Sequence, residues 1–363
     1  LVVIAWATGH TIAQLTGAKT VADRVQCSAR AIGDCGMDVM REKLLHFLEL
    51  DEYLDDQAIP AQRRPAHGAA RTGEPKTTAE TQARSIATRF RKVHHLGEQP
   101  LGDLIAVIEQ AIGIDVAVLS AGPDEHGLAM RDPAEGTVFI GVARTRNPMR
   151  QRSTLAHELG HVLFEDYADA DGRNWSSRTP EEIRADAFAR HLLIPIEGLR
   201  QFVADRGPAT ESVLSDVVQR FLVSPQIAAI ALNQAGYVDD DTKQKWMALT
   251  APTLAVRFGW SDQYRALQID SDQLRAPQLL LARTIKGYTE GVVSAQAIAT
   301  LRDIMLDTAE AELREAGIEP VEAPIPWVTA DELPDVQVDM AALDADLNAA
   351  DDTGEYIVDD DAG

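Results

Sequence analysis

Two histidines four residues apart, with a glutamate directly after the first, stand inside an apolar helical segment, QRSTLAHELGHVLFEDY (151–167). In an α-helix, positions i and i+4 share one face with Cβ atoms about 5–6 Å apart, so the rings of His157 and His161 can reach one metal ion. Glu158 lies about 100° further round the helix and can reach a water on that ion without being a ligand. Burying these three groups without a partner would cost on the order of several kcal/mol, which a metal would offset. The spacing therefore predicts a catalytic metal centre.

A third ligand must come from elsewhere, because catalytic zinc usually takes three protein ligands and leaves a fourth position for water. One zinc-protease pattern continues as H-E-x-x-H-x-x-G-x-x-H. Here Phe164 and Tyr167 occupy the later glycine and histidine positions, so that class is excluded.

The next helix, expected from about Thr179 to Leu193, carries Glu182 and Asp186 one turn apart on one face. We expect Glu182 to be the third ligand and Asp186 to hold the ring N–H of a ligating histidine, most simply His157. Thr179 and Glu182 also form a capping-box pattern, in which the glutamate would only return a hydrogen bond to the backbone. The competing ligands are Glu181, Glu165, Asp171 and His191.

Two segments in this order, RQRSTLAHELGHVLF (150–164) and EEIRADAFARHLLIP (181–195), resemble the gluzincin-like ImmA/IrrE-type zinc metallopeptidases. The resemblance covers about Leu101 to Val238 and includes the strand–turn–strand before the first helix. It implies zinc bound by His157, His161 and Glu182, with Glu158 as the catalytic base. Mn²⁺ and Fe²⁺ also accept two imidazoles and a carboxylate, so the donor set does not fix the metal.

The family resemblance also implies a function. Its members cleave helix-turn-helix repressors, so we expect a zinc-dependent metalloendopeptidase that relieves repression of prophage, mobile-element or stress genes. The alternative is a non-catalytic regulatory or toxin–antitoxin-type interaction protein on the same zincin fold. An open coordination position and Glu158 favour the enzyme, since a closed structural site needs neither.

The fold class expected from the pattern is α+β and predominantly helical, with a zincin-like core and a small antiparallel sheet before the metal-binding helix. IDVAVLS (114–120) and TVFIGVA (137–143) are short and β-branched, and GLAMRD (127–132) is a third candidate strand. We expect the second to bind substrate as an extended peptide, through Val138, Phe139, Ile140, Gly141 and Val142. The candidates for an oxyanion donor are Tyr167, His126 and His191.

Composition divides the chain into an N-terminal helical segment (1–58), a linker rich in Pro, Gly, Ala and Arg (59–78), a metallopeptidase domain (79–250), a helical C-terminal region (251–328) and an acidic tail (329–363) that we expect to be disordered. The first segment has no convincing repressor-like DNA-binding pattern. Val217 to Val238 has a helix–turn–helix rhythm, which we interpret as a packing unit.

A formal net charge of −23 disfavours binding to nucleic-acid phosphates or anionic lipid. Two cysteines, Cys27 and Cys35, exclude a disulfide-rich scaffold and read as reduced thiols. No apolar run has the length of a membrane helix. We therefore expect a cytoplasmic protein with one zinc ion and a protein substrate, without a membrane partner and without direct nucleic-acid binding.

Overall fold

Five short strands form one sheet in the order β2-β4-β3-β1-β5. The computed structural model describes residues 20–28, 38–61, 78–122, 126–169, 179–204 and 209–321. Most of the expected linker, the acidic tail, Cys35 and Asp171 lie outside these residues. The strands are β1 (Gln26–Ser28), β2 (Asp115–Leu119), β3 (Gly127–Arg131), β4 (Val138–Ala143) and β5 (Tyr167–Asp169).

The predicted fold class and the three expected strands are confirmed, but the sheet is mixed and not purely antiparallel. β3 follows β2 in sequence and pairs antiparallel with one edge of β4. β2 pairs with the other edge of β4 and runs parallel to it. β1 and β5, which the sequence did not predict, extend the sheet antiparallel beyond β3. Each has only three residues, too few to give a recognisable alternation of apolar and polar positions.

The structure contradicts the expected role of Val138 to Val142 as a substrate-binding edge. β4 is hydrogen-bonded to β2 along one edge and to β3 along the other. A strand in the interior of a sheet has no free backbone groups to offer an extended peptide. Any peptide that joins this sheet must therefore do so at another strand.

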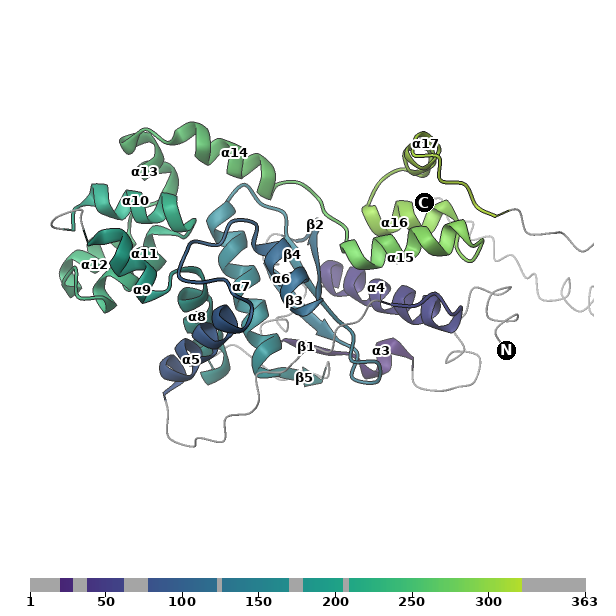
Figure 1. Ribbon diagram of the computed structural model, residues 1–363, viewed down its shortest axis with the longest axis horizontal. Helices are drawn as coiled ribbons and strands as arrows, with labels where there is room; N and C mark the ends of the chain where they lie inside the picture. The colour runs from purple at the N-terminus through teal and green to yellow at the C-terminus, as the bar shows by residue number, and fades with distance from the viewer. Residues whose placement is uncertain are drawn as a thin grey trace, which may run out of the picture. The chain divides into compact units, whose positions relative to one another are not determined.

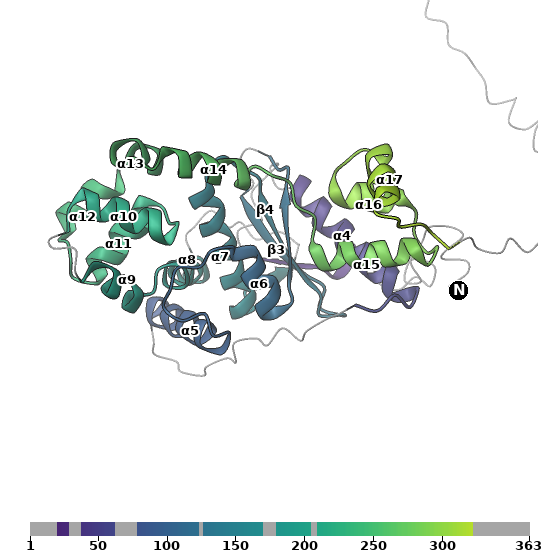
Figure 2. The ribbon, with the colours of Figure 1, turned by 45° about the horizontal axis from the view of Figure 1, so that its top comes forward.

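Helices cover both faces of the sheet (Figures 1 and 2). α6 (Leu104–Ile112) and α7 (Pro148–Phe164) pack on one face, and α4 (Asp38–Asp56) and α15 (Gln278–Thr289) on the other. Successive strand residues point to opposite faces, so the strands divide their apolar side chains between two cores. The core beside α7 takes Val116, Val118, Ile140 and Val142, and the core beside α4 takes Ala117, Leu119, Met130 and Phe139.

The remaining helices flank this centre. α8 (Pro180–Leu193) packs against α7, α5 (Ala79–Val93) packs against α8, and α3 (Val21–Arg24) precedes β1. The others are α9 (Ile196–Val203), α10 (Glu211–Phe221), α11 (Pro225–Gln234), α12 (Asp240–Met247), α13 (Ala251–Phe258), α14 (Ser261–Ser271), α16 (Ala295–Arg302) and α17 (Leu306–Glu315). In the described chain, no single helix has the length and apolarity of a membrane span; α10 and α11 meet that test only together, with a bend of 111° between them.

Candidate metal centre

The helix that carries the two histidines begins and ends with clear local signals. Asn147 caps α7 by accepting the backbone N–H of Arg150 at 3.2 Å, and Pro148 follows at the first helical position. The helix ends at Glu165, whose φ of 57° reverses the chain. Within α7, His157 is 2% exposed, and Glu158 and His161 are fully buried. Three ionisable groups are thus taken out of water on one helix, which requires partners for each.

A close helix crossing brings α8 to these histidines. A Cβ atom added at Gly160 would lie 3.1 Å from the ring of Phe188 and 3.3 Å from Cα of Ala185, so the glycine allows α7 and α8 to approach. Thr179 caps α8 by accepting the backbone N–H of Glu182 at 3.4 Å. This places Glu182 in the first turn of α8, with its carboxylate turned to the histidines.

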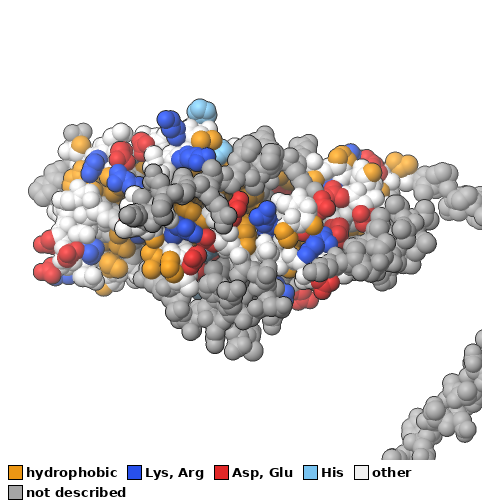
Figure 3. All heavy atoms as spheres, turned by 90° about the horizontal axis from the view of Figure 1, so that it is seen from below, with side chains coloured by type: hydrophobic (Ala, Val, Ile, Leu, Met, Phe, Trp, Pro, Cys, Tyr) orange, Lys and Arg blue, Asp and Glu red, His pale blue; other side chains and the backbone are white. Residues whose placement is uncertain are grey.

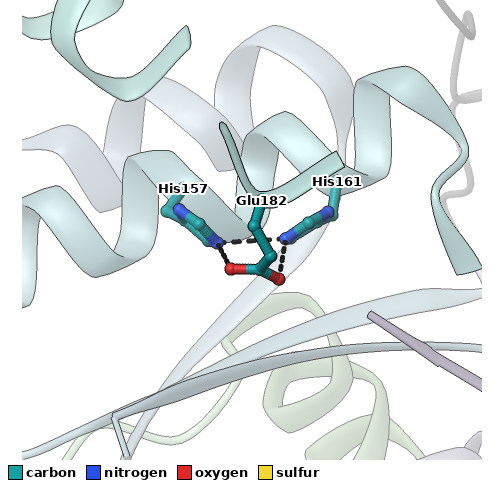
Figure 4. Close-up of side chains that lie close together, drawn as sticks. All are labelled: His157, His161 and Glu182. Atoms are coloured by element: carbon teal, nitrogen blue, oxygen red, sulfur yellow. Dashed lines mark hydrogen bonds and ion pairs between the residues drawn. The ribbon is translucent and has the colours of Figure 1, made fainter. Parts of the chain in front are cut away.

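The side chains of His157, His161 and Glu182 converge (Figure 4), and their candidate ligand atoms all lie within 4.8 Å of one another. The two Nε2 atoms are 3.0 Å apart, and each is 3.4 Å from a carboxylate oxygen of Glu182. Two ligands about 2.1 Å from a zinc ion at a tetrahedral angle are about 3.4 Å apart. The three residues therefore fit a single zinc ion as its protein ligands.

Both rings face a carboxylate on the side away from Glu182. Nδ1 of His157 lies 2.9 Å from Oδ1 of Asp186, the residue expected to hold this ring. Nδ1 of His161 lies 3.7 Å from Oδ2 of Asp166, which also forms an ion pair with Arg184. Such partners orient a ligating imidazole so that its other nitrogen faces the metal.

These contacts determine the charge balance of the site. Burial lowers the pKa of His157, but hydrogen bonds to Asp186 and Glu182 outweigh it and the net pKa is raised. For His161, burial is likewise outweighed by Asp166 and Glu182, and its pKa is raised to about 9. Burial would raise the pKa of Glu182, but the two histidines hold it well below its usual range. Glu182 is thus ionised at neutral pH, which is the form that binds a metal.

Glu158 lies next to this group in a different environment. Its Oε2 accepts hydrogen bonds from the hydroxyl of Ser28 at 2.7 Å and from the backbone N–H of Ala129 at 3.1 Å. Its Oε1 is buried without a hydrogen-bond partner among the described residues. Buried polar atoms are almost always paired with protein or water, so Oε1 marks a place for a water beside the candidate metal site. One oxygen is held by the protein while the other is available for chemistry.

Of the competing ligands in the described chain, none joins the convergent group. His191 lies on α8 but contacts Glu80, with its Nε2 2.8 Å from Oε1 of that carboxylate. Glu165 is exposed at the end of α7. Thr179 does cap α8, as the capping-box alternative for Glu182 requires. The Glu182 carboxylate nevertheless faces both histidines.

The three candidates for an oxyanion donor differ in their surroundings. His126 contacts the side chain of Arg150, and His191 contacts Glu80. The hydroxyl of Tyr167 is buried and has no hydrogen-bond partner in the described part of the chain. Burial raises the pKa of Tyr167, so the phenol keeps its proton and can donate it in a hydrogen bond. Its assignment stays a prediction.

Sequence reasoning missed two residues of this site. Asp166 lies two positions after the end of α7. Its closeness in sequence to His161 could have marked it as a partner of that ring. Ser28 is 130 positions from Glu158 along the chain, and nothing in its local sequence marks it.

The face of the molecule in Figure 3 carries Lys and Arg side chains interspersed with Asp and Glu. This distribution differs from the continuous basic patch that binding to a nucleic-acid backbone requires.

Comparison with known proteins identifies the central segment. Residues 109–233, about a third of the chain, match the model of a peptidase family described as the IrrE N-terminal-like domain. The match begins in α6, contains β2 to β5, α7 and α8, and ends in α11. A search of curated proteins found no match. The family is zinc-dependent in general, which agrees with the His157, His161 and Glu182 group. The match of residues 109–233 supports an ImmA/IrrE-type metallopeptidase family for this segment of the chain.

Proposed function

We propose that this protein is a zinc-dependent metalloendopeptidase that cleaves a helix-turn-helix transcriptional repressor. Such cleavage would relieve repression of prophage, mobile-element or stress genes, and it would take place in the cytoplasm, where the repressor acts. The observation that carries the proposal is the convergence of His157, His161 and Glu182 beside the buried carboxylate of Glu158. The family match supports the peptidase activity.

The residues of the site divide the work of peptide hydrolysis between them. His157, His161 and Glu182 would hold the zinc ion, which when bound supplies Lewis-acid activation of water and of the scissile carbonyl. Glu158 would take the proton of the attacking water at Oε1 and deliver it to the leaving amine. The backbone N–H of Ala129 holds Oε2, which leaves Oε1 as the carboxylate oxygen without a partner among the described residues. The hydrogen bond to Asp186 keeps the His157 ring oriented, and Asp166 lies 3.7 Å from the outer nitrogen of His161.

The proposal of a repressor as substrate rests on the family resemblance and on charge. A chain with a net charge of −23 is repelled by duplex DNA, so its regulatory effect would pass through a protein and not through direct DNA binding. A basic DNA-binding repressor would instead be attracted to it over several ångströms at low ionic strength.

The first test removes the base and keeps the ligands. Glu158→Gln should lose cleavage by a factor of at least about 100, since general-base catalysis contributes about 10²–10⁴-fold, while metal analysis still finds one zinc per chain. Glu181→Gln, on the residue next to the proposed ligand, is the matched control and should keep both zinc and activity. The assay co-expresses each variant with a repressor encoded beside its gene and follows the repressor by immunoblot.

Two outcomes would contradict the proposal. Continued cutting of the repressor by Glu158→Gln would remove this residue from the mechanism. An intact repressor beside the zinc-loaded wild-type protein would point to the non-catalytic alternative, in which the fold only binds its partner.

A further inference from the structure

β1 lies in the sheet between β3 and β5 (Figure 1), and its last residue, Ser28, contacts Glu158 of the candidate metal centre. It pairs antiparallel with both neighbours, Cys27 standing opposite Met130 of β3 and opposite Ala168 of β5. β1 precedes the family-matched segment, whereas β3 and β5 belong to it. In its absence, β3 would present an edge of free backbone groups next to α7.

This edge lies directly against the catalytic machinery. The backbone N–H of Ala129, in the middle of β3, donates to Oε2 of Glu158, and a Cβ atom at Gly127 would lie 3.1 Å from Cγ of Glu158. A peptide that is to be cut must place its carbonyl within about 3–3.5 Å of a nucleophile held by this base. An extended segment running along β3 satisfies this requirement through main-chain hydrogen bonds.

β1 occupies that position. The hydroxyl of Ser28, its last residue, lies 2.7 Å from Oε2 of Glu158 and also accepts the N–H of Ala129 at 3.1 Å. No second chain can run between β3 and β5 while β1 is hydrogen-bonded to both. The near-complete burial of His157, Glu158 and His161 agrees with this occlusion.

The attachment of β1 is specific but small. Arg24 in α3 forms two hydrogen bonds with the buried Asp132, at 2.9 and 2.8 Å, and a third with Glu52 at 2.8 Å. Val25 and Cys27 bury their side chains in the core beside α4. The strand itself has only three residues, so its pairing can open without dismantling the central three strands.

We infer that β1 is a built-in competitor for the substrate: it covers the edge of β3 that binds an extended segment of the protein to be cut, and it must leave before cleavage. This inference rests on the proposed function, because it names the substrate-binding strand and the regulation of the same site. The substrate would run antiparallel to β3, as β1 does, with its scissile bond taking the place of Ser28 beside Glu158.

The test locks β1 in place with one disulfide. Cys27 and Met130 are partners in the antiparallel register, and both side chains point into the same core. Facing residues of an antiparallel pair have Cα atoms about 4.5–5.5 Å apart, within the range of about 4.4–6.8 Å that a disulfide spans. Met130→Cys is made in the full chain together with Cys35→Ser, so that Cys27 has one possible partner. The reduced and oxidised forms of this protein are controls for each other, and thiol titration together with circular dichroism verifies closure and folding.

Binding is measured with zinc-loaded protein that also carries Glu158→Gln, using fluorescein-labelled unfolded casein with blocked thiols as the extended polypeptide. Fluorescence anisotropy should give at least tenfold weaker binding to the oxidised form than to the reduced form, with recovery after treatment with a phosphine reductant. Equal binding to the two forms, or binding to neither, would overturn the inference.

A second assay measures cleavage of the same casein by the Met130→Cys, Cys35→Ser protein with Glu158 intact. It separates this inference from the proposed function. Equal cutting by the oxidised and reduced forms would support a peptidase and overturn the competitor role of β1. Lock-sensitive binding without cutting in either form would support the competitor role and contradict the hydrolytic function.

Discussion

At the scale of single residues, each of the two histidine rings has a carboxylate on the side away from Glu182. Asp186 lies 2.9 Å from Nδ1 of His157, and Asp166 lies 3.7 Å from Nδ1 of His161. A carboxylate behind an imidazole selects the tautomer that leaves Nε2 free and makes that nitrogen more basic. The closer contact makes His157 the ring whose orientation depends more on its partner.

Replacing Asp186 with asparagine should therefore weaken zinc binding by about 10–100-fold without removing a ligand. Competition with a chromophoric chelator measures this affinity. Asp307→Asn, at an exposed position of α17, is the matched control and should leave the affinity unchanged. An unchanged affinity in Asp186→Asn would mean that the hydrogen bond does not support the ligand.

Spacing within one helix predicted His157, Glu158 and His161, because their relative positions follow from helix geometry alone. Glu182 was the first choice for the third ligand, but the sequence could not exclude its competitors. Whether its carboxylate reaches the histidines depends on how two helices cross. Ser28 was out of reach, because its contact with Glu158 requires the whole chain to fold between them.

At the scale of elements, the crossing of α7 and α8 at Gly160 determines whether the third ligand reaches the first two. The glycine lies between the two histidines on the side that faces Ala185 and Phe188. Its place within the H-E-x-x-H pattern therefore has a packing reason in addition to the spacing of the ligands. α8 can approach α7 only as far as this position allows.

Gly160→Ala should push α8 away from α7, because the added Cβ would come within 3.1 Å of the Phe188 ring and 3.3 Å of the Ala185 backbone. Overpacking of this kind typically costs about 1–3 kcal/mol, and here it would also displace Glu182. We expect a lower melting temperature and weaker zinc binding, measured by calorimetry and chelator competition. Gly102→Ala, where the added atom meets nothing within 4 Å, should change neither. Zinc binding at wild-type strength in Gly160→Ala would show that the crossing tolerates the extra atom.

Element prediction succeeded where the pattern was long and failed where it was short. α4 lies in the N-terminal segment that was expected to be helical. β2 and β4 were found from their β-branched runs, and β3 was the third candidate strand. The parallel pairing of β2 with β4 and the insertion of β1 depend on contacts between distant segments, which local periodicity does not encode. The expectation of a substrate edge on β4 failed for that reason.

At the scale of the whole molecule, the segments outside the family match close the far face of the sheet. α4 and α15 share a core with Leu119, Met130 and Phe139 of the sheet. The buried Arg283 of α15 donates to the backbone carbonyl of Ile59 at 2.7 Å and pairs with Asp51 of α4. The compositional boundaries drawn at residues 58 and 251 stay predictions, but the packing joins both flanking regions to the sheet.

Asp115 also connects a flanking region to the sheet, but burying its charged carboxylate costs free energy. Its carboxylate, at the start of β2, accepts the backbone N–H groups of Leu279 and Leu280 at 2.8 and 2.7 Å. These bonds connect the sheet to the first turn of α15. Burial nevertheless raises the pKa of Asp115 to about 6, and the two hydrogen bonds only partly offset it.

A carboxyl group whose pKa is raised on folding binds its proton more tightly in the folded state than in the unfolded chain. Its contribution to stability is therefore complete below about pH 4, the pKa of an unfolded aspartate, and is lost as the pH rises through about 6. A rise of about two pKa units corresponds to about 3 kcal/mol lost between pH 4 and pH 7.

Asp115→Asn removes this titration. The substitution has a cost that does not depend on pH, but the stability of the variant relative to wild type should rise by about 3 kcal/mol from pH 4 to pH 7. The measurement is the difference in free energy of unfolding between variant and wild type, from denaturant titrations at several pH values and constant zinc. Asp262→Asn, at a fully exposed side chain, should show no such trend. A pH-independent difference for Asp115→Asn would mean that folding does not raise the pKa of Asp115, and that the buried carboxylate is charged at no cost.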